Sequence, residues 1–354
     1  MVAASGGIGR PGFALPLFAH EYGLSCQKCH TVIPRLSEFG VAFMNNGYKL
    51  PGGVRSGAYI PISTKLNLAY TSEPDPTGLP QAIVDEVELL TGGTLGSRAN
   101  YFVEQYAVDG GRHGSLRDAW LSWRVTPDDA RVPVRVLAGQ FTLPVPVDPE
   151  TYRETGTHYA LFDQVVGNNP FNFFDDKLGA AVRIGRPDRG THVELAALQG
   201  HDRQSGLATR GTDTMTVVQH AMGAVVVSGY RYAGMRPDAD FTNRFSRTGF
   251  GLSYSRGRWT SDTVLQTGTD SSFDGAGTTF VSSGGFSQLR YEFNRKVFGL
   301  VRYDGRQDTS GFARSTTALV GYRAARNTRF TLEDTISHIP HAKHVLIAQY
   351  ALAY

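Results

Sequence analysis

Apolar and polar residues alternate along most of this chain, and this pattern restricts its fold more than any other feature of the sequence. From about Ala58 onward, runs with a period of two residues recur between polar turns; in one of them Leu289, Tyr291 and Phe293 alternate with polar residues. A period of two places successive side chains on opposite faces of a β-strand. Forty-one Gly, 20 Phe and 16 Tyr also favour strands and turns. The sequence therefore predicts a mainly β fold.

A soluble β-sandwich alternates in the same way as a barrel, so the period alone leaves both folds open. Three features favour a closed barrel. The strand pattern continues without a break to Tyr354, and short connections alternate with long ones, as periplasmic turns and extracellular loops do. The chain also stops on an alternating run that resembles the closing strand of outer-membrane barrels, namely His344, Leu346, Ala348, Tyr350, Leu352 and Tyr354.

The connections can be counted. Short turns are expected near residues 92–97, 126–131, 186–190, 256–258, 294–296 and 324–327. Longer links are expected near 72–80, 108–115, 142–176, 200–212, 233–245, 268–284 and 306–313. Strict alternation fails once, and restoring it requires a turn near 219–223 inside an over-long run. With that turn, the fold is a 16-stranded transmembrane antiparallel β-barrel with both barrel ends on the periplasmic side, and the even number is the one that closed bacterial barrels require.

Composition limits the possible partners. The 354 residues have a formal net charge of +3 and contain no Lys/Arg-rich block, so nucleic acid is not an expected partner. No run of about 18 apolar residues exists, which excludes a transmembrane helix but not a membrane barrel in contact with outer-membrane lipid. The first 20 residues contain a lone Arg10 and no compact apolar stretch, so they lack the pattern of a secretory signal.

The two cysteines of the chain fall in one motif, Cys26-Gln27-Lys28-Cys29-His30. This spacing lets two thiols add to the two vinyl groups of one haem, and the adjacent His30 then coordinates the iron as proximal ligand. A disulfide, a thioredoxin-like redox pair and half of a zinc site are the competing interpretations. The redox pair lacks a βαβ context and the zinc site lacks a second Cys/His pair. The motif predicts one covalent haem c, which implies export because haem is attached to thiols outside the cytoplasmic membrane.

A small α-helical module is expected around the motif. Pro34 can open a helix on which Leu36, Phe39, Gly40 and Phe43 recur at helical spacing, and Asn45-Asn46-Gly47 supplies a stop. The predicted stripe of Phe39, Gly40 and Phe43 would cover one face of the haem, with Gly40 permitting close approach. A stripe packed only on protein is the alternative.

The sixth position of the haem iron is left open by the sequence. His20 and Met44 are the nearby candidates for the distal ligand, since imidazole and thioether are both known haem ligands. His20 could equally be a solvated loop residue, and Met44 a core filler. A lumen-facing ligand from the barrel, or an open position, are the remaining possibilities.

A set of residues around the haem motif resembles a known family. It consists of the segment Leu15-Pro16-Leu17-Phe18-Ala19, Gly23, the haem motif, Pro34, Leu36, Phe39-Gly40, Phe43 and Gly47-Tyr48. They resemble the N-terminal module of the fused monohaem cytochrome c-porins of the outer membrane, whose best known members oxidise iron(II). The resemblance implies a leader or disordered segment at 1–12, a monohaem module at 13–55 and a barrel at 56–354. The family usually has Arg at the position of His20 and a polar residue at that of Met44, so neither residue inherits an axial role.

The leading functional hypothesis is electron transfer across the bacterial outer membrane, from a small extracellular donor such as iron(II) to a periplasmic cytochrome. The resemblance implies that the chain could have iron(II):cytochrome c oxidoreductase activity, which is the enzymatic form of this hypothesis. A passive solute porin with a haem-containing plug and a soluble exported haem protein are the alternatives. The 142–176 link carries the aromatic cluster of Phe171, Phe173 and Phe174. It also carries six acids, namely Asp148, Glu150, Glu154, Asp163, Asp175 and Asp176. We expect an ordered loop at the barrel mouth whose acids either recruit cations or are ordinary solvated charges.

Overall fold

The computed structural model describes most of the chain from residue 62 onward and the central part of the N-terminal module. The described residues are 18, 22, 24, 26–30, 35–46, 48, 50, 62–74, 79–127, 130–149, 152–187, 189–201, 208–237, 241–325, 327–339 and 342–353.

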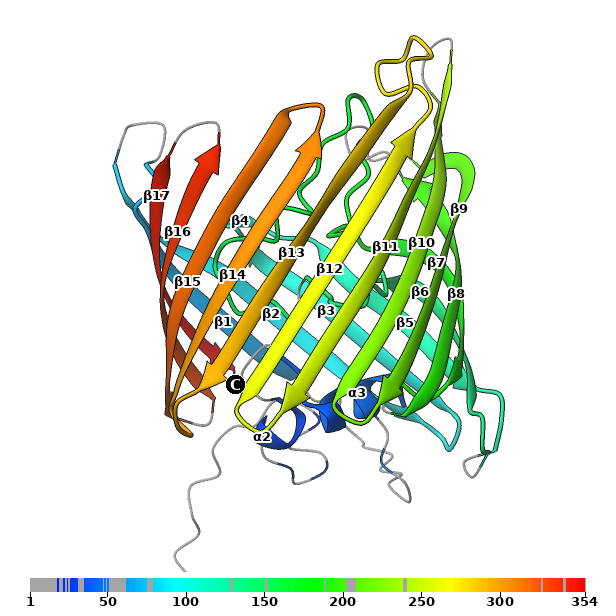
Figure 1. The fold of residues 1–354 in the computed structure, drawn as a ribbon. Helices are drawn as coiled ribbons and strands as arrows, with labels where there is room; N and C mark the ends of the chain where they lie inside the picture. The colour runs from blue at the N-terminus through cyan, green and yellow to red at the C-terminus, as the bar shows by residue number, and fades with distance from the viewer. Residues whose placement is uncertain are drawn as a thin grey trace, which may run out of the picture.

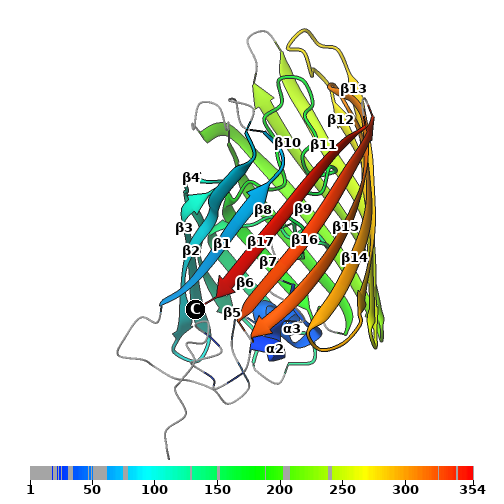
Figure 2. The ribbon, with the colours of Figure 1, turned by 90° about the vertical axis from the view of Figure 1, so that its left-hand side faces the viewer.

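All described strands belong to one antiparallel sheet that closes on itself (Figures 1 and 2). The short β4 and the following β5 both pair with β3, so β4 and β5 together occupy one strand position and the barrel has sixteen strands. The strands are β1 Ile62–Thr71, β2 Gln81–Leu95, β3 Ala99–Asp109, β4 Arg112–His113, β5 Leu116–Arg124, β6 Val134–Phe141, β7 Lys177–Gly185, β8 Gly190–His201, β9 Ala208–Met222, β10 Val225–Pro237, β11 Thr242–Arg256, β12 Trp259–Asp270, β13 Phe280–Glu292, β14 Val297–Asp308, β15 Gly311–Ala325, β16 Thr328–Ile339 and β17 Lys343–Ala353. The predicted count of sixteen is confirmed.

The barrel closes between its first and last strands. Leu66 of β1 lies opposite Val87 of β2 on one side and opposite Leu352 of β17 on the other. Figure 2 shows β1 and β17 side by side, with the C-terminus at the same end as the short turns. Closure pairs the backbone of the two would-be edge strands, which a bilayer requires because it offers no water to unpaired backbone groups.

The hidden turn predicted near 219–223 exists. Met222 pairs with Val225 across a two-residue turn, and Gly223 adopts a φ of 61° that favours glycine. The link predicted at 306–313 is tighter than expected, because Asp308 already pairs with Gly311. The links at 200–212 and 233–245 are also shorter than predicted, since the strands continue past the point where their hydrophobic alternation fades.

The outer surface of the barrel is apolar and the lumen side is largely polar. Leu289 of β13 and Phe293 directly after that strand are about half exposed, whereas Arg290 between them is 2% exposed. The same outward pattern occurs around the barrel, for example at Leu121, Leu265, Val301, Val320 and Leu332. An apolar exterior on a closed sixteen-stranded barrel is the arrangement of bacterial outer-membrane proteins. The protein is therefore placed in the bacterial outer membrane. None of the helices in the described ranges is long and apolar enough to cross a membrane.

The segment between β6 and β7, residues 142–176, folds into the lumen, and we call it the plug. Figure 1 shows this green segment inside the barrel. It brings apolar side chains with it, so Leu143, Val147 and Leu161 are fully buried. They join lumen-facing aromatic residues such as Tyr232 and Phe286 in one core cluster. The predicted ordered loop is thus found, but it packs into the lumen rather than only at the mouth, because burial of its apolar side chains stabilises that position.

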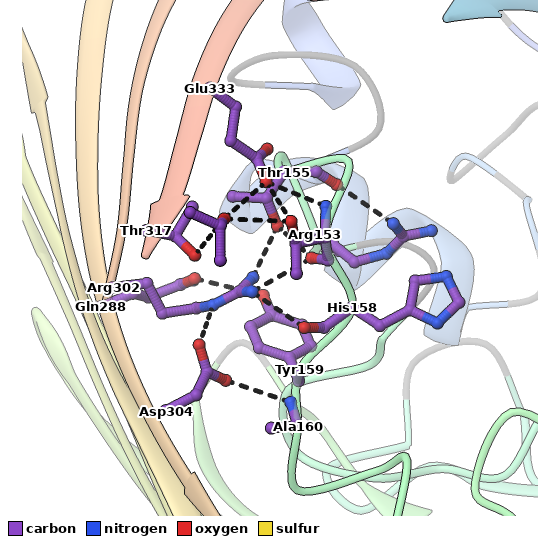
Figure 3. A network of polar contacts seen from close by, with 12 residues as sticks. Arg153, Thr155, His158, Tyr159, Ala160, Gln288, Arg302, Asp304, Thr317 and Glu333 are labelled. Carbon is purple, nitrogen blue, oxygen red and sulfur yellow. Dashed lines mark hydrogen bonds and ion pairs between the residues drawn. The ribbon is translucent and has the colours of Figure 1, made fainter. Parts of the chain in front are cut away.

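Polar contacts tie the plug to β13–β16 (Figure 3). The Glu333 carboxylate accepts hydrogen bonds from the backbone N–H groups of Gly156 at 2.6 Å and Thr157 at 3.0 Å. Arg302 is fully buried; its Nε lies 2.6 Å from Asp304, and its Nη2 donates to the carbonyls of Thr157 and His158. Paired and hydrogen-bonded charges of this kind fix the path of a segment that has no regular secondary structure.

Candidate functional site

Two short helices carry the haem motif and the predicted stripe. Helix α2 spans Cys26–Cys29 and helix α3 spans Glu38–Asn45. Ser37 caps α3: its Oγ accepts a hydrogen bond from Gly40 N–H at 3.1 Å and donates one to Lys28 O at 2.7 Å, so the cap also joins the two helices. The helix predicted from Pro34 therefore begins at Glu38, where a capping side chain is present; Pro34 itself lies outside the described residues. The predicted stop after Asn45 is confirmed.

Gly40 places the two helices in backbone contact. A Cβ atom at this position would lie 1.9 Å from the carbonyl oxygen of Cys29, closer than any side chain could be accommodated. The Ser37 N–H also donates to that oxygen at 2.8 Å. Gly40 thus allows α3 to lie directly against α2, and this protein contact is itself a reason for a glycine at this position.

Arg35 joins the helical module to the barrel wall. Its Nη1 lies 2.7 Å from Asp262 Oδ2 on β12, and both side chains are almost completely buried. The guanidinium also lies over the ring of Tyr152 in the plug, 5.1 Å from its centroid. Burial alone would lower the pKa of Arg35, but the charge and hydrogen bonding of Asp262 outweigh it and the pKa is raised. Arg35 is therefore a permanent cation at the junction of module, wall and plug.

The far end of α3 is held by the opposite side of the barrel. Arg135 of β6 donates to the backbone carbonyl of Asn46 at 2.6 Å, and Arg124 of β5 donates to the Asn46 side chain. Tyr48 stacks at 6.1 Å on Trp120 of β5. The module consequently bridges the periplasmic end of the lumen from β5 and β6 across to β12, and Figure 1 shows α2 and α3 at this end.

An aromatic array leads from α3 to the wall. Ring centroids are separated by 6.1 Å between Phe39 and Phe43, 5.6 Å between Phe43 and Tyr48, and 5.3 Å between Tyr48 and Phe102. Phe102 in turn lies 5.7 Å from Trp120. Burial raises the pKa of Tyr48, so its phenol stays protonated at neutral pH. The array is a rigid apolar border between the module and the wall.

A cavity of about 460 Å³ lies between the module, the plug and the wall. Of the sequence-predicted site residues, Cys29, His30, Gly40, Phe43 and Met44 line it. Phe39 instead packs against Lys28, whose Nζ lies 4.7 Å from the ring centroid. Cys26 is the first residue of α2, but its side chain lies outside the described part of the structure. The whole of His20 also lies outside it.

The structure adds a cavity residue that the sequence did not single out, His192 of β8. It is 4% exposed, lines the same cavity as Cys29 and His30, and its Nδ1 has no hydrogen-bond partner in the protein. Its Nε2 lies 4.0 Å from Glu194 Oε2, and Glu194 is paired with Arg183 at 3.0 Å. In the sequence, His192 is one polar residue in an alternating strand, and nothing distinguishes it from other lumen-facing residues.

Three of the plug acids predicted as possible cation ligands lie beside Arg or Lys side chains, and a fourth lies near a histidine. Glu154 pairs with Arg290 at 2.8 Å and Asp176 with Arg117 at 3.1 Å. Asp175 lies 3.4 Å from Lys177, and Asp163 lies 3.5 Å from His158. Glu150 is outside the described residues. Among the residues that the structure describes, no group of three or more His, Cys, Asp and Glu side chains could hold a metal ion.

The residues present at the cavity fit a c-type haem. Cys29 and His30 lie at its border, adjacent in the chain, and the two motif cysteines are spaced along one helix, as two thioether bonds to one macrocycle require. Phe43, Tyr48, Phe102 and Trp120 give the cavity an aromatic wall suited to an apolar macrocycle. The chemistry and placement of the donor set are thus compatible with the cofactor that the motif predicts.

Fold and surface together define a sixteen-stranded outer-membrane β-barrel. Comparison with solved structures agrees. The chain is similar to an anion-selective porin from Comamonas acidovorans, with 11% identity, 84% of this chain and 99% of that chain covered and a TM-score of 0.63. It is also similar to the outer membrane channel DcaP of Acinetobacter baumannii, with 11% identity, 86% and 100% covered and a TM-score of 0.60. OmpF of Salmonella typhi, solved in complex with daunomycin, matches with 10% identity, 83% and 97% covered and a TM-score of 0.60.

These likenesses concern the fold. No protein-family model matches the sequence, and no curated protein matches it either. What the barrel does must therefore be argued from its own site.

Proposed function

We propose that this chain is an outer-membrane cytochrome-porin in which one haem c, held by Cys26, Cys29 and His30, carries electrons from a small extracellular donor to a periplasmic cytochrome. The observation that carries the proposal is that Cys29 and His30 line a cavity at the periplasmic end of the lumen. The likeness of the module to fused monohaem cytochrome c-porins points the same way. When bound, the haem supplies a one-electron redox step.

The residues of the chain have distinct roles in this proposal. The thiols of Cys26 and Cys29 would hold the macrocycle covalently, and His30 would bind the iron. The aromatic border formed by Phe43, Tyr48 and Phe102 limits the access of water, which tunes the reduction potential of a haem. Arg35 and Asn46 fix the module to both sides of the barrel, so that the site keeps one position relative to the lumen.

Iron(II) is the donor that we propose, as the family likeness suggests. Each turnover removes one electron from iron(II), which leaves as iron(III), and delivers that electron to one oxidised periplasmic cytochrome. The apolar band of such barrels is about 25 Å tall. Because the haem motif is at the periplasmic end, the donor has to enter the lumen from the extracellular side, along the cavity that reaches Tyr106 and Arg117 on β3 and β5.

The test uses the purified full-length protein in liposomes that enclose oxidised cytochrome c. Iron(II) added outside should reduce the enclosed cytochrome, and Cys29→Ala protein, checked for a folded barrel, should not support this. Cytochrome reduction at equal rates by both proteins would refute the proposal.

A second candidate function is passive solute transport, which the likeness to porins favours. The plug opposes it, because an apolar core that includes Leu143, Leu161 and Phe162 occupies part of the lumen. Swelling of liposomes in small uncharged sugars separates the two functions. Rapid swelling together with no electron transfer would assign the chain to passive transport.

A further inference from the structure

We propose that His192, on the barrel wall, supplies the sixth ligand to the haem iron that His30 holds from the module. This inference rests on the proposed function and adds a residue to it. It makes the redox site composite, with one axial histidine from the helical module and the other from a transmembrane strand.

His192 lies near the part of the wall that holds the module. Arg135 of β6 contacts Asn46 at the end of α3. Arg135 lies directly opposite Arg183 of β7, and Arg183 lies directly opposite Glu194 of β8. Neighbouring strands are about 4.8 Å apart, so Glu194 is roughly 10 Å along the wall from the point where the module is held. His192 is two residues from Glu194 and on the same lumen-facing side, toward the periplasmic end.

The buried His192 side chain has one ring nitrogen without a hydrogen-bond partner. Burial of an imidazole nitrogen without a hydrogen-bond partner costs free energy, so such a nitrogen calls for an explanation. Nδ1 of His192 is in this condition, and the residue is 96% removed from solvent while lining the cavity. Coordination of a metal would satisfy the lone pair of that nitrogen.

A carboxylate lies near the other ring nitrogen of His192. Histidines that bind metals usually direct their second nitrogen toward a carboxylate, which sets the tautomer and raises the basicity of the ligand. Nε2 of His192 lies 4.0 Å from the Glu194 carboxylate, and Arg183 holds that carboxylate at 3.0 Å. Arg183, Glu194 and His192 therefore form a row on β7 and β8 with the free nitrogen at its end.

Met44 is the competing ligand that the structure describes. It lines the cavity, but it lies one helical turn after Gly40, on a helix that touches α2 backbone to backbone. A ligand on α3 would thus approach from the same rigid unit as His30. His192 belongs to the wall that faces this unit, and an opposite approach is what two axial ligands of one iron require.

The test is spectroscopic and uses the full-length protein in detergent. We expect wild-type ferric protein to be low-spin by electron paramagnetic resonance and visible absorption. In His192→Ala most of the haem should become high-spin, and added imidazole should restore the low-spin spectrum by occupying the vacated position. His192→Met should remain six-coordinate with a raised reduction potential, and this variant serves if His192→Ala does not fold.

His220→Ala is the matched control. His220 lies on the neighbouring strand β9 with its side chain exposed, where Nδ1 is 2.9 Å from Thr191 Oγ1, so its loss should leave the haem spectrum unchanged. Met44→Leu and His20→Ala should also leave it unchanged. A low-spin spectrum that survives His192→Ala, or a high-spin spectrum in the wild type, overturns the inference while covalent haem on a stained gel still upholds the proposed function. Absence of covalent haem in the wild type overturns both.

Discussion

Arg290 of β13 and Glu154 of the plug form an ion pair of 2.8 Å from which solvent is excluded, with side-chain exposures of 2% and 0%. The pair joins residues 136 positions apart in the chain. Loss of Glu154 would leave the buried Arg290 with only the partly exposed Glu292, 2.9 Å away, as its counter-ion, which is more costly than loss of a pair on the surface.

We therefore expect Glu154→Ala to destabilise the plug by about 3–5 kcal/mol. The measurement is the urea dependence of the folded, faster-migrating form on a gel run without heating. The exposed pair of Lys343 and Glu73 is the control, and Lys343→Ala should cost no more than about 1 kcal/mol. Equal effects of the two substitutions would mean that the plug contributes little to stability. Glu154→Leu combined with Arg290→Leu should recover much of the loss.

Covalent haem should depend on each cysteine separately, because each thioether bond needs its own thiol. Cys26→Ala and Cys29→Ala should each remove most of the haem stain from a denaturing gel, and the double variant should remove all of it. Lys28→Ala, between the two cysteines, should retain the stain. Haem that stays attached to the double variant would disprove the central assignment.

The plug should limit passive flux. Replacing residues 150–170 with a short Gly/Ser linker should raise the single-channel conductance several-fold in a planar bilayer, since the plug side chains leave the lumen. Deleting residues 274–277 of the loop between β12 and β13, which are largely exposed, leaves the hydrogen bond from Asn168 N–H to Phe273 O in place and should not change it. If both deletions gave the wild-type conductance, the plug would not be the barrier.

Removal of the Arg35 guanidinium should release the module from the wall. Arg35→Ala leaves Asp262 buried without its cation, so we expect faster cleavage of the N-terminal segment in limited proteolysis with the barrel intact. Arg35→Asp with Asp262→Arg should restore part of the protection. Unchanged cleavage in Arg35→Ala would show that Asn46 and Tyr48 suffice to hold the module.

The plug acids can be tested as a donor filter. If Asp175 and Asp176 recruit cations, their joint change to Asn slows haem reduction by iron(II) and not by a small uncharged reductant. Their pairing with Lys177 and Arg117 makes a structural role the competing expectation, in which both rates change together. Stopped-flow absorbance of the two reactions distinguishes these outcomes.

The barrel could be predicted because alternation is a local property. Apolar residues point outward along the strands and polar residues mostly inward, as Leu289 and Arg290 illustrate, and even the turn at Gly223 followed from the requirement for an even count. Helix α3 begins at Glu38 rather than near Pro34 as predicted, because the Ser37 side chain caps its first turn.

The site was only partly predictable. Cys26, Cys29 and His30 are recognisable because their spacing reflects covalent chemistry. The plug contacts and His192 are not, because they depend on which residues meet inside the closed barrel. Gly156 and Glu333 are 177 positions apart, and no local pattern relates them. His192 obeys the same alternation as every other lumen-facing residue of β8, so only its missing partner and its cavity distinguish it.

The seam between β1 and β17 also has a consequence for biogenesis. The last strand of the chain is needed to complete the wall around a module that lies near its beginning. Once that wall is complete, Arg35 and Phe43 are buried and Cys29 lines an internal cavity. On the proposed function, we therefore expect the enzyme that attaches haem to act before insertion into the membrane. The periplasmic chaperones would then receive a chain that already carries its pigment, and a pulse-chase experiment should show haem on the unfolded form first.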